Sequence, residues 1–381
     1  VGEGYHARAG GPHGEIVALR KAGGRARAGT LYINLEPCCH YGRTPPCTDA
    51  ILASGIKKVI VGMRDPNKEV AGKGIRILKQ NGIEVVTGVL EPECRRLNEI
   101  YVKYISTGKP YVILKAALSL DGKISTRTGE SQWITGSAAR QKSHELRNKV
   151  DAVLVGTETV LNDNPRLTTR IKNRQVKHPV RVILDRSNRI PLTANIFKNA
   201  RSQRVIYVSG NGLSTSRKKN LDRLGVETFI LQTNRGRLNL KQLMKKLGEM
   251  ELISVLIEGG SEVNASALKE KIVDKILFFV APIIIGGNNA RGAVGGEGIA
   301  KLKDAYKIKT KENSFNYYDA ESGLLIMTEE STNQGGNIIK SITKFSDYRE
   351  VDGILYAFKR EITAGPQKIE FEITSVIFNE E

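Results

Sequence analysis

The chain has 381 residues, 40% of them apolar, which is enough for two or three domains with ordinary hydrophobic cores. Its longest apolar stretch, at residues 276–285, is broken by Pro282 and is too short to span a bilayer, which argues against a membrane protein. No signal peptide is visible, so we expect a cytoplasmic protein. The formal net charge of +19 favours an anionic partner, such as a phosphorylated substrate, a nucleotide cofactor, nucleic acid or an anionic surface.

Short apolar strands alternate with helical segments in the first 108 residues. This βαβα rhythm predicts an α/β layered domain. The Gly- and Pro-containing segment Thr107-Gly108-Lys109-Pro110 is typical of a turn or linker, and we therefore expect this domain to end at residue 108. The strands are expected at 30–35, 57–63 and 83–87, and the helices at 71–80 and 91–106.

A second α/β domain is expected at residues 109–311. Apolar runs of strand length alternate there with helical patterns, and a further strand is expected at 276–285. The other strands are expected at 111–117, 152–157, 180–184, 204–208, 227–231 and 254–257, and the helices at 136–150 and 238–247.

Residues 312–381 differ in charge and in period from the rest of the chain. They carry six basic and thirteen acidic side chains, so this segment is acidic while the remainder is strongly basic. Alternating apolar residues at 324–328, 338–345, 354–359 and 369–377 predict successive antiparallel strands. We therefore expect an acidic β-rich tail, to which we assign no function.

Two short segments carry the residues of a catalytic zinc site. One is Pro12-His13-Gly14-Glu15, and the other runs from Glu36-Pro37-Cys38 to Cys47. A catalytic zinc takes three protein ligands and keeps one position for water, and a carboxylate beside that water can move protons. The H-x-E pattern followed by P-C is typical of zinc deaminases, in which the Glu is not a ligand. We predict His13, Cys38 and Cys47 as ligands and Glu15 as the proton shuttle.

Other cysteine and histidine residues near these ligands are weaker candidates for binding the metal. Adjacent side chains rarely reach the same metal, so Cys39 is interpreted as structural and His40 as facing the substrate. Cys94 is interpreted as a small core residue. The prolines Pro45 and Pro46 suit the first turn of a helix that would place Cys47 at its start, where the helix dipole favours a thiolate.

The second domain has polar residues where α/β folds place ligands, at strand ends and in loops. The run Ile257-Glu258-Gly259-Gly260-Ser261 ends a strand and opens a helix to about Lys269. Glycines there would let the backbone approach a phosphate, although the run alone favours a plain strand–helix turn.

The sequence resembles a known family at these positions. The string EPCCHYGRTPPCTDAI, the RDPN of residues 64–67 and the VAGKG of residues 70–74 closely resemble the deaminase domain of the bifunctional riboflavin-biosynthesis deaminase/reductases. The eight residues between Cys38 and Cys47 differ from the P-C-x-x-C spacing usual in nucleic-acid deaminases. Segments 115–123, 129–135, 156–168 and 257–261 are similar to the reductase domain of the same family.

The resemblance implies a three-layer cytidine-deaminase-like domain followed by a dihydrofolate-reductase-like α/β domain. It implies zinc-dependent deamination of 2,5-diamino-6-ribosylamino-4(3H)-pyrimidinone 5′-phosphate and NADPH-dependent reduction of the ribosyl group to ribityl. Zn²⁺ and NADPH would be the cofactors, and a homo-oligomer is expected. Neither nucleic acid nor a membrane is expected as a partner.

The resemblance also implies roles for matching reductase positions. Lys115 and Glu258 would polarise the sugar, and the arginines of the substrate set suit its phosphate. Cofactor contacts would come from Ala117, Trp133, Thr159, Asp163, Gly260, Ser261, Glu262, Val263, Asn264, Ala265 and Ser266. Substrate contacts would come from Ser131, Arg147, Leu167, Arg170 and Glu258.

The resemblance covers residues 1 to about 311, and the first helix and first strand of the family have no counterpart here. Three alternatives therefore stay open: a reductase with an inactive deaminase domain, a nucleic-acid deaminase, and a non-catalytic fragment. The attached reductase and the scarcity of aromatic residues beside basic clusters argue against the nucleic-acid deaminase.

Overall fold

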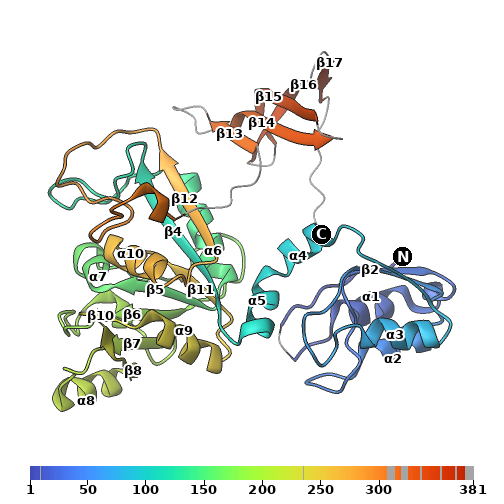
Figure 1. Ribbon diagram of the computed structural model, residues 1–381, viewed down its shortest axis with the longest axis horizontal. Coiled ribbons are helices and arrows are strands. Elements are labelled where there is room, and N and C mark those ends of the chain that lie inside the picture. The colour runs from blue at the N-terminus through green and yellow to red at the C-terminus, as the bar shows by residue number, and fades with distance from the viewer. Residues whose placement is uncertain are drawn as a thin grey trace. The chain divides into compact units, whose positions relative to one another are not determined.

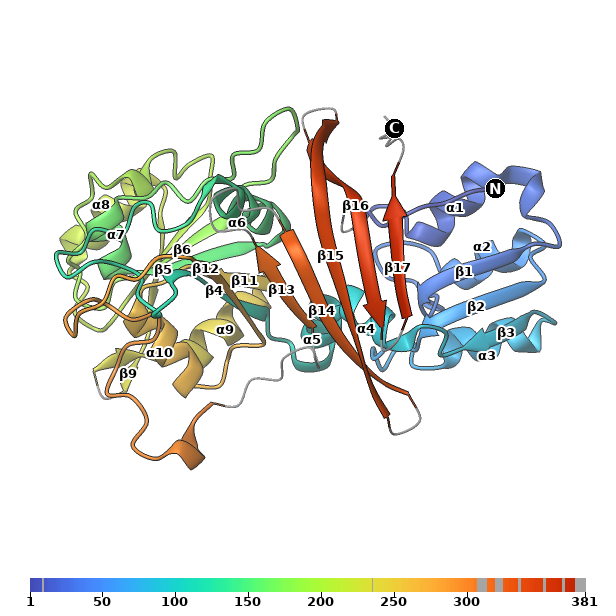
Figure 2. The same ribbon diagram turned by 90° about the horizontal axis from the view of Figure 1, so that it is seen from above.

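The computed structural model describes residues 1–8, 10–234, 236–306, 314–318, 325–334, 337–351, 354–364 and 367–373 (Figures 1 and 2). It divides into two compact units, residues 1–116 with 144–277 and residues 117–143 with 278–381. In the described part of the chain, no helix has the length and apolarity needed to cross a membrane. The domain boundary predicted after residue 311 lies outside the described residues, and the boundaries of the three domains stay predictions.

The N-terminal α/β domain is built on a parallel sheet of three strands in the order β1-β2-β3. Each strand lies within one residue of its predicted bounds, because runs of Val and Ile at strand length give a clear signal. The strands are β1 (Thr30–Leu35), β2 (Lys58–Met63) and β3 (Glu84–Thr87), and the helices are α1 (Gly14–Ala22), η1 (Gly23–Ala26), α2 (Cys47–Ala53), α3 (Lys73–Gln80), α4 (Glu91–Leu97) and α5 (Glu99–Thr107).

Helices cover both faces of this sheet, which gives the predicted three layers. Val59 and Val61 point to one face, where they join a core with residues from α1, α2 and α3. Gly62 points to the other face. A Cβ atom on Gly62 would lie 2.2 Å from the Cys94 sulfur, so α4 packs directly against the glycine. Cys94 is therefore a packing residue, although it is only half-buried and is not the core residue interpreted from the sequence.

The single helix predicted at residues 91–106 is wrong, since two helices meet at Asn98. The second of them, α5, bonds to the second α/β domain. Its Lys103 pairs with Asp274 at 2.7 Å, Glu99 pairs with Lys275, and the Tyr104 hydroxyl donates to the Gly248 carbonyl. Ile100 packs on the apolar cluster of that domain.

The second domain contains a seven-stranded sheet in the order β12-β4-β11-β5-β6-β7-β8. Neighbouring strands are parallel in the part of this sheet ordered β4-β11-β5-β6-β7-β8, as expected for a strand–helix alternation. The strands are β4 (Tyr111–Ser119), β5 (Ala152–Gly156), β6 (Val180–Leu184), β7 (Val205–Ser209), β8 (Glu227–Ile230), β11 (Ser254–Ile257) and β12 (Lys275–Ala281), with a short hairpin of β9 (Thr233–Asn234) and β10 (Arg237–Leu238).

Strand β5 separates two cores. Ala152 and Leu154 enter a cluster with the apolar face of α9, while Val153 and Val155 enter a second cluster with Val160 and Leu221 from α7 and α8. All five residues of β5 are buried, so the strand reads as a continuous apolar run. The helices are α6 (Ser137–Lys149), α7 (Thr157–Asp163), η2 (Asn195–Phe197), α8 (Thr215–Leu224), α9 (Leu240–Glu249), α10 (Ser261–Lys269) and η3 (Leu302–Asp304).

The tail forms an antiparallel sheet of five strands in sequence order (Figure 2). The four predicted antiparallel strands are confirmed in type, and β13 was missed by the sequence analysis. The ends of two predicted strands, residue 324 and residues 374–377, lie outside the described residues. The strands are β13 (Ser314–Tyr318), β14 (Leu325–Gln334), β15 (Asn337–Val351), β16 (Ile354–Ala364) and β17 (Gln367–Glu372).

Candidate functional site

The three predicted zinc ligands meet near the starts of α1 and α2. His13 is the N-cap residue of α1, Cys47 is the first residue of α2, and Cys38 follows β1. The His13 Nδ1 atom is 3.2 Å from the Cys47 sulfur and 3.5 Å from the Cys38 sulfur. All three ligand atoms lie within 4.8 Å of one another. The structure therefore brings these side chains together on one point.

This donor set fits Zn²⁺. With zinc–nitrogen and zinc–sulfur bonds of about 2.1 and 2.3 Å, tetrahedral ligand atoms are separated by about 3.5–3.8 Å, close to the distances here. The His13 Nε2 atom is 3.3 Å from the Thr44 hydroxyl, a contact that orients the ring so that Nδ1 faces the sulfurs. One His and two Cys leave a fourth position for water, as a catalytic site requires.

The two cysteine sulfurs differ in their affinity for a proton. Hydrogen bonds from Cys47 and His13 outweigh burial and lower the pKa of Cys38 to about 4. The hydrogen bond to the Cys38 sulfur, together with burial, raises the pKa of Cys47. A thiolate at Cys38 is therefore present near neutral pH, and binding of a metal would displace the proton from Cys47.

Glu15 lies in the first turn of α1, beside the ligands. Burial raises its pKa above the ordinary value, although the positive charge of His13 opposes the shift. The carboxyl group also interacts with the Cys47 sulfur. A carboxyl group with a raised pKa beside the ligand set is suited to take up and return a proton.

Glu36 supports the cysteine segment, and the sequence analysis gave it no role. Its side chain is 2% exposed. It accepts main-chain hydrogen bonds from Asp65 at 3.2 Å, Gly72 at 2.9 Å and Ile75 at 3.2 Å. The RDPN segment and the start of α3 are thereby tied to the residue that precedes Pro37-Cys38. These donors are 29 to 39 residues away along the chain, so no local pattern could have predicted the contact.

Gly74 should tolerate no side chain. A Cβ atom there would lie 2.2 Å from the Pro37 carbonyl oxygen, directly before Cys38. We expect Gly74→Ala to push α3 away from the cysteine segment, to lower the unfolding temperature and to reduce the zinc content, at a cost of about 1–3 kcal/mol. Gly24→Ala is the matched control, because its Cβ would meet no atom within 4 Å. Equal zinc content and equal melting of both variants would contradict the prediction.

Two details differ from the sequence analysis or extend it. The placement of Pro45 and Pro46 in the first helical turn is wrong, because Pro46 is the extended N-cap residue and both prolines precede the helix. Cys47 nevertheless begins α2, as predicted. The Nδ1 atom of His40 is buried and has no hydrogen-bond partner among the described residues.

The second α/β domain contains a buried charge cluster at the end of β11. Glu258 follows β11 and accepts from Arg147 Nε at 2.6 Å and Nη2 at 2.7 Å. Their side chains are only 8% and 14% exposed. Burial lowers the pKa of Lys115 on β4, and Glu258 opposes this shift. The two predicted polarising residues, Lys115 and Glu258, therefore belong to one interacting group.

The start of α10 suits a phosphate. Gly260 is its N-cap residue and makes no side-chain cap, so the first main-chain N–H groups of a nine-residue helix face outward. Gly259 has φ +102°, a conformation that requires glycine. A Cβ atom on Gly260 would approach the Thr159 hydroxyl to 3.3 Å, which places this predicted cofactor residue beside the turn.

The other members of the predicted cofactor set have different positions. Residues Ser261–Ser266 form the first turns of α10, and Asp163 ends α7. Ala117 lies on β4, within the second compact unit. Trp133 lies in that unit too, with its ring exposed and the Arg140 guanidinium 4.7 Å from the ring centre.

The predicted substrate residues are also divided between the two compact units. Leu167 is buried with φ +53°, and Arg170 is exposed three residues later. Arg147 uses its guanidinium for Glu258 and for the Thr168 carbonyl, at 3.3 Å. Ser131 lies in the second compact unit. The structure thus brings Arg147, Glu258 and the segment around Leu167 into one neighbourhood.

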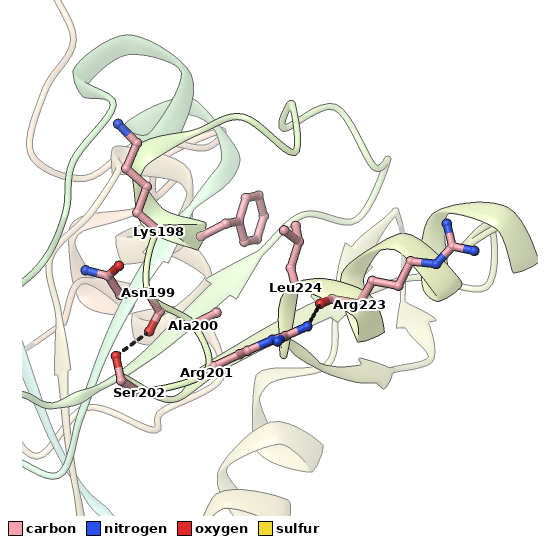
Figure 3. A pocket seen from close by; sticks show the side chains of 8 residues that line it. Lys198, Asn199, Ala200, Arg201, Ser202, Arg223 and Leu224 are labelled. Carbon is pink, nitrogen blue, oxygen red and sulfur yellow. Dashed lines mark hydrogen bonds between the residues drawn. The ribbon is translucent and has the colours of Figure 1, made fainter.

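A separate cavity of about 580 Å³ lies in the second α/β domain and is shown in Figure 3. Its lining includes the side chains of Lys198, Arg201 and Arg223, and the Arg201 guanidinium donates to the Arg223 carbonyl at 2.9 Å. None of its lining residues belongs to the predicted deaminase or reductase sites.

Two family models match the chain. The model described as "RibD C-terminal domain" matches residues 110–316, and the model described as "Cytidine and deoxycytidylate deaminase zinc-binding region" matches residues 1–63. A curated relative, the riboflavin biosynthesis protein RibD of Actinobacillus pleuropneumoniae, is 43% identical over 311 residues, 82% of this chain and 82% of the relative. The chain belongs to the RibD family. The riboflavin biosynthesis protein RibD of Aquifex aeolicus is also 43% identical to this chain, over 82% of this chain and 85% of the relative.

Solved RibD structures agree with this assignment. The chain is similar to Acinetobacter baumannii RibD, form 1, with a TM-score of 0.73, 39% identity and coverage of 84% of this chain and 86% of that one. It is also similar to the diaminohydroxyphosphoribosylaminopyrimidine deaminase/5-amino-6-(5-phosphoribosylamino)uracil reductase of Thermotoga maritima. There the TM-score is 0.70, the identity 37% and the coverage 83% and 85%.

As a RibD family member, the chain is a bifunctional riboflavin-biosynthesis enzyme with a zinc-binding deaminase domain and an NADPH-dependent reductase domain. The predicted fold class, the enzyme class and the cofactors Zn²⁺ and NADPH are confirmed. The alternatives are not favoured, because the family match includes both catalytic domains.

Proposed function

We propose that the chain hydrolyses the ring amine of 2,5-diamino-6-ribosylamino-4(3H)-pyrimidinone 5′-phosphate and then reduces the ribosyl group of the product to ribityl. The observation that carries the first step is the convergence of His13, Cys38 and Cys47, with Glu15 beside them. The description of the Thermotoga maritima protein as both a deaminase and a reductase supports the pairing of the two activities.

In the deamination step these residues hold the metal and move the proton. Zn²⁺ bound by His13, Cys38 and Cys47 supplies the acidity that activates water for hydrolysis. Glu15 accepts the proton of that water and delivers it to the leaving amine. We assign His40 to the substrate side, which is supported by its buried ring nitrogen without a protein partner among the described residues.

In the reduction step the chain positions the sugar and the cofactor. NADPH supplies the hydride, and the N-terminus of α10 with Gly260 holds its phosphates. Lys115 and Glu258 polarise the reacting sugar. Arg170 binds the substrate phosphate, because it is exposed, whereas Arg147 is engaged with Glu258.

The test is incubation of the zinc-loaded protein with this substrate and NADPH, with products followed by mass spectrometry. The expected product has exchanged an amine for oxygen and has gained two hydrogens. Reduction of a deaminated substrate without deamination would instead support a reductase with an inactive first domain. If folded, zinc-loaded protein makes neither change to the substrate, the proposal is contradicted.

We also propose a homo-oligomer formed through the edge of the reductase sheet. Strand β12 is the outer strand of the described sheet, opposite β8. Exposed apolar side chains gather on it and on the segments next to it, where the Leu120 main chain bonds to Ile283. The exposed apolar residues of this surface are Leu120, Phe278, Val280, Ile283, Ile284 and Val294.

Val280→Arg should dissociate this oligomer, because a charge would be buried against a second copy of the same edge. The measurement is the molar mass in solution by light scattering. Ile230→Arg is the matched control: Ile230 is exposed to a similar degree, 49% against 53%, but lies on the opposite edge strand β8. A wild-type protein that is monomeric, or an oligomer unaffected by Val280→Arg, would contradict this interface.

The cytoplasmic location expected from the sequence stays a prediction.

A further inference from the structure

The segment from Leu167 to Arg170 is held by side chains from elsewhere in the reductase domain. His178 Nδ1 accepts the main-chain N–H of Thr169 at 3.3 Å, and Arg147 Nη1 donates to the Thr168 carbonyl at 3.3 Å. His144 Nδ1, on α6, accepts the main-chain N–H of Arg170 at 3.3 Å. Three consecutive residues thus have their main chain fixed by side chains, which is unusual support for a loop.

His144 contacts Arg170 twice. Its second ring nitrogen, Nε2, is 3.4 Å from Arg170 Nη2. A neutral imidazole has one acceptor nitrogen, and either tautomer can therefore accept from Arg170, through the main chain or through the guanidinium. A protonated imidazole has no acceptor at all and places a positive charge against an arginine. Only the neutral ring can hold Arg170.

The charges around His144 come from three elements. Arg147 lies one turn further along α6, Arg170 lies in the held segment, and Glu258 follows β11. Burial lowers the pKa of His144, and Arg147 and Arg170 lower it further. The carboxylate of Glu258, which is bound to Arg147 by two hydrogen bonds, and a hydrogen bond with the Thr168 main chain oppose this shift but do not outweigh it. The ring is therefore neutral at neutral pH.

We propose that His144 is a positioning residue for the reductase step, which as a neutral imidazole holds Arg170 where the substrate phosphate binds. This inference rests on the proposed function and adds a residue to it. It also gives the reductase a pH dependence in substrate binding. As the pH falls below the ordinary histidine range, the ring takes up a proton and releases Arg170, so the affinity for a phosphorylated substrate falls.

The test compares His144→Leu with His144→Asn in the full chain. Leucine removes both ring acceptors, whereas the asparagine oxygen can take the position of Nδ1. We expect His144→Leu to raise the KM for the deaminated, phosphorylated substrate about tenfold or more, with kcat and the KM for NADPH changed less than twofold. We expect His144→Asn to recover most of the KM. The rise in KM at acidic pH that we expect for the wild type should be absent from His144→Asn, which does not titrate.

A dephosphorylated substrate separates positioning from general damage. If His144 acts through Arg170 and the phosphate, wild type and His144→Leu should have the same KM for the dephosphorylated substrate. An equal rise in KM for both substrates, or no rise for either, would overturn the inference. If Arg170→Ala leaves the KM of the phosphorylated substrate unchanged in an active enzyme, the inference fails, together with the assignment of Arg170 to the substrate phosphate, although the proposed deamination and reduction stand. If the wild-type protein has no reductase activity, the proposed function fails instead.

Discussion

Glu15→Gln is expected to lower the rate of deamination about 10²- to 10⁴-fold, while reduction of the deaminated substrate is unchanged. The amide keeps the size of the side chain and its place in the first turn of α1, but it cannot take up a proton. Burial raises the pKa of Glu15 above the ordinary value, which strengthens the native carboxylate as a base. The measurement is the deamination rate by product analysis, with saturating Zn²⁺.

The controls for Glu15→Gln isolate the proton transfer. Zinc content should equal that of the wild type, because Glu15 is not one of the three converging ligands. Glu84→Gln removes an exposed carboxylate of the same domain, paired with Lys58 at 2.7 Å, and should leave the rate unchanged. Retention of more than a tenth of the wild-type rate by Glu15→Gln would show that another group moves the proton.

Arg147→Met is expected to destabilise the reductase domain by about 3–5 kcal/mol, because it leaves the Glu258 carboxylate buried without its partner. The pair is 2.6 Å apart and largely buried. Arg204→Met is the matched control. Arg204 makes an equally short bond to Glu227, but both side chains are 41% exposed, so the loss should be about 1 kcal/mol or less. The measurement is the free energy of unfolding in urea by circular dichroism.

The deficit of Arg147→Met should depend on pH. Burial alone would raise the pKa of Glu258, but Arg147, with Lys115 and His144, outweighs burial and lowers it below the ordinary value of 4.5. The pair therefore contributes its full stability above pH 4.5 and loses it as the pH falls through the lower pKa of the folded state. The variant lacks this term, so its deficit should shrink as the pH falls below 4.5. A deficit as small as that of Arg204→Met at pH 7 would contradict the prediction.

Local patterns predicted the zinc ligands and much of the sheet framework. His13 and Glu15 are two residues apart, and Cys38 and Cys47 belong to one motif, so two short patterns were enough to predict the set, although the fold brings His13 to cysteines that are 25 and 34 residues away. Strands β1, β6 and β11 have their predicted bounds because each is a compact run of β-branched and aliphatic residues. The reductase residues could be placed by family resemblance, since their spacing alone gave only weak signals.

Other features depend on contacts that spacing does not encode. Helix α8 was missed because only Leu221 of its ten residues is buried, which gives no apolar period. Glu36, His144 and His178 act on main-chain N–H groups far along the chain or in an irregular segment. Such contacts need no particular partner side chain, and therefore leave no pair of residues in the sequence to recognise.

Helix α5 belongs to the reductase domain by its contacts, although it precedes the boundary predicted from the sequence. By sequence the second domain starts at Lys109, after the helix, yet Glu99, Lys103 and Tyr104 all bond to residues of that domain. Ile100 adds to its apolar cluster. A reductase cut at residue 109 would lack these contacts. We therefore expect it to unfold more easily than a reductase that begins at Glu99, so the segment that joins the two domains also contributes to the stability of the second.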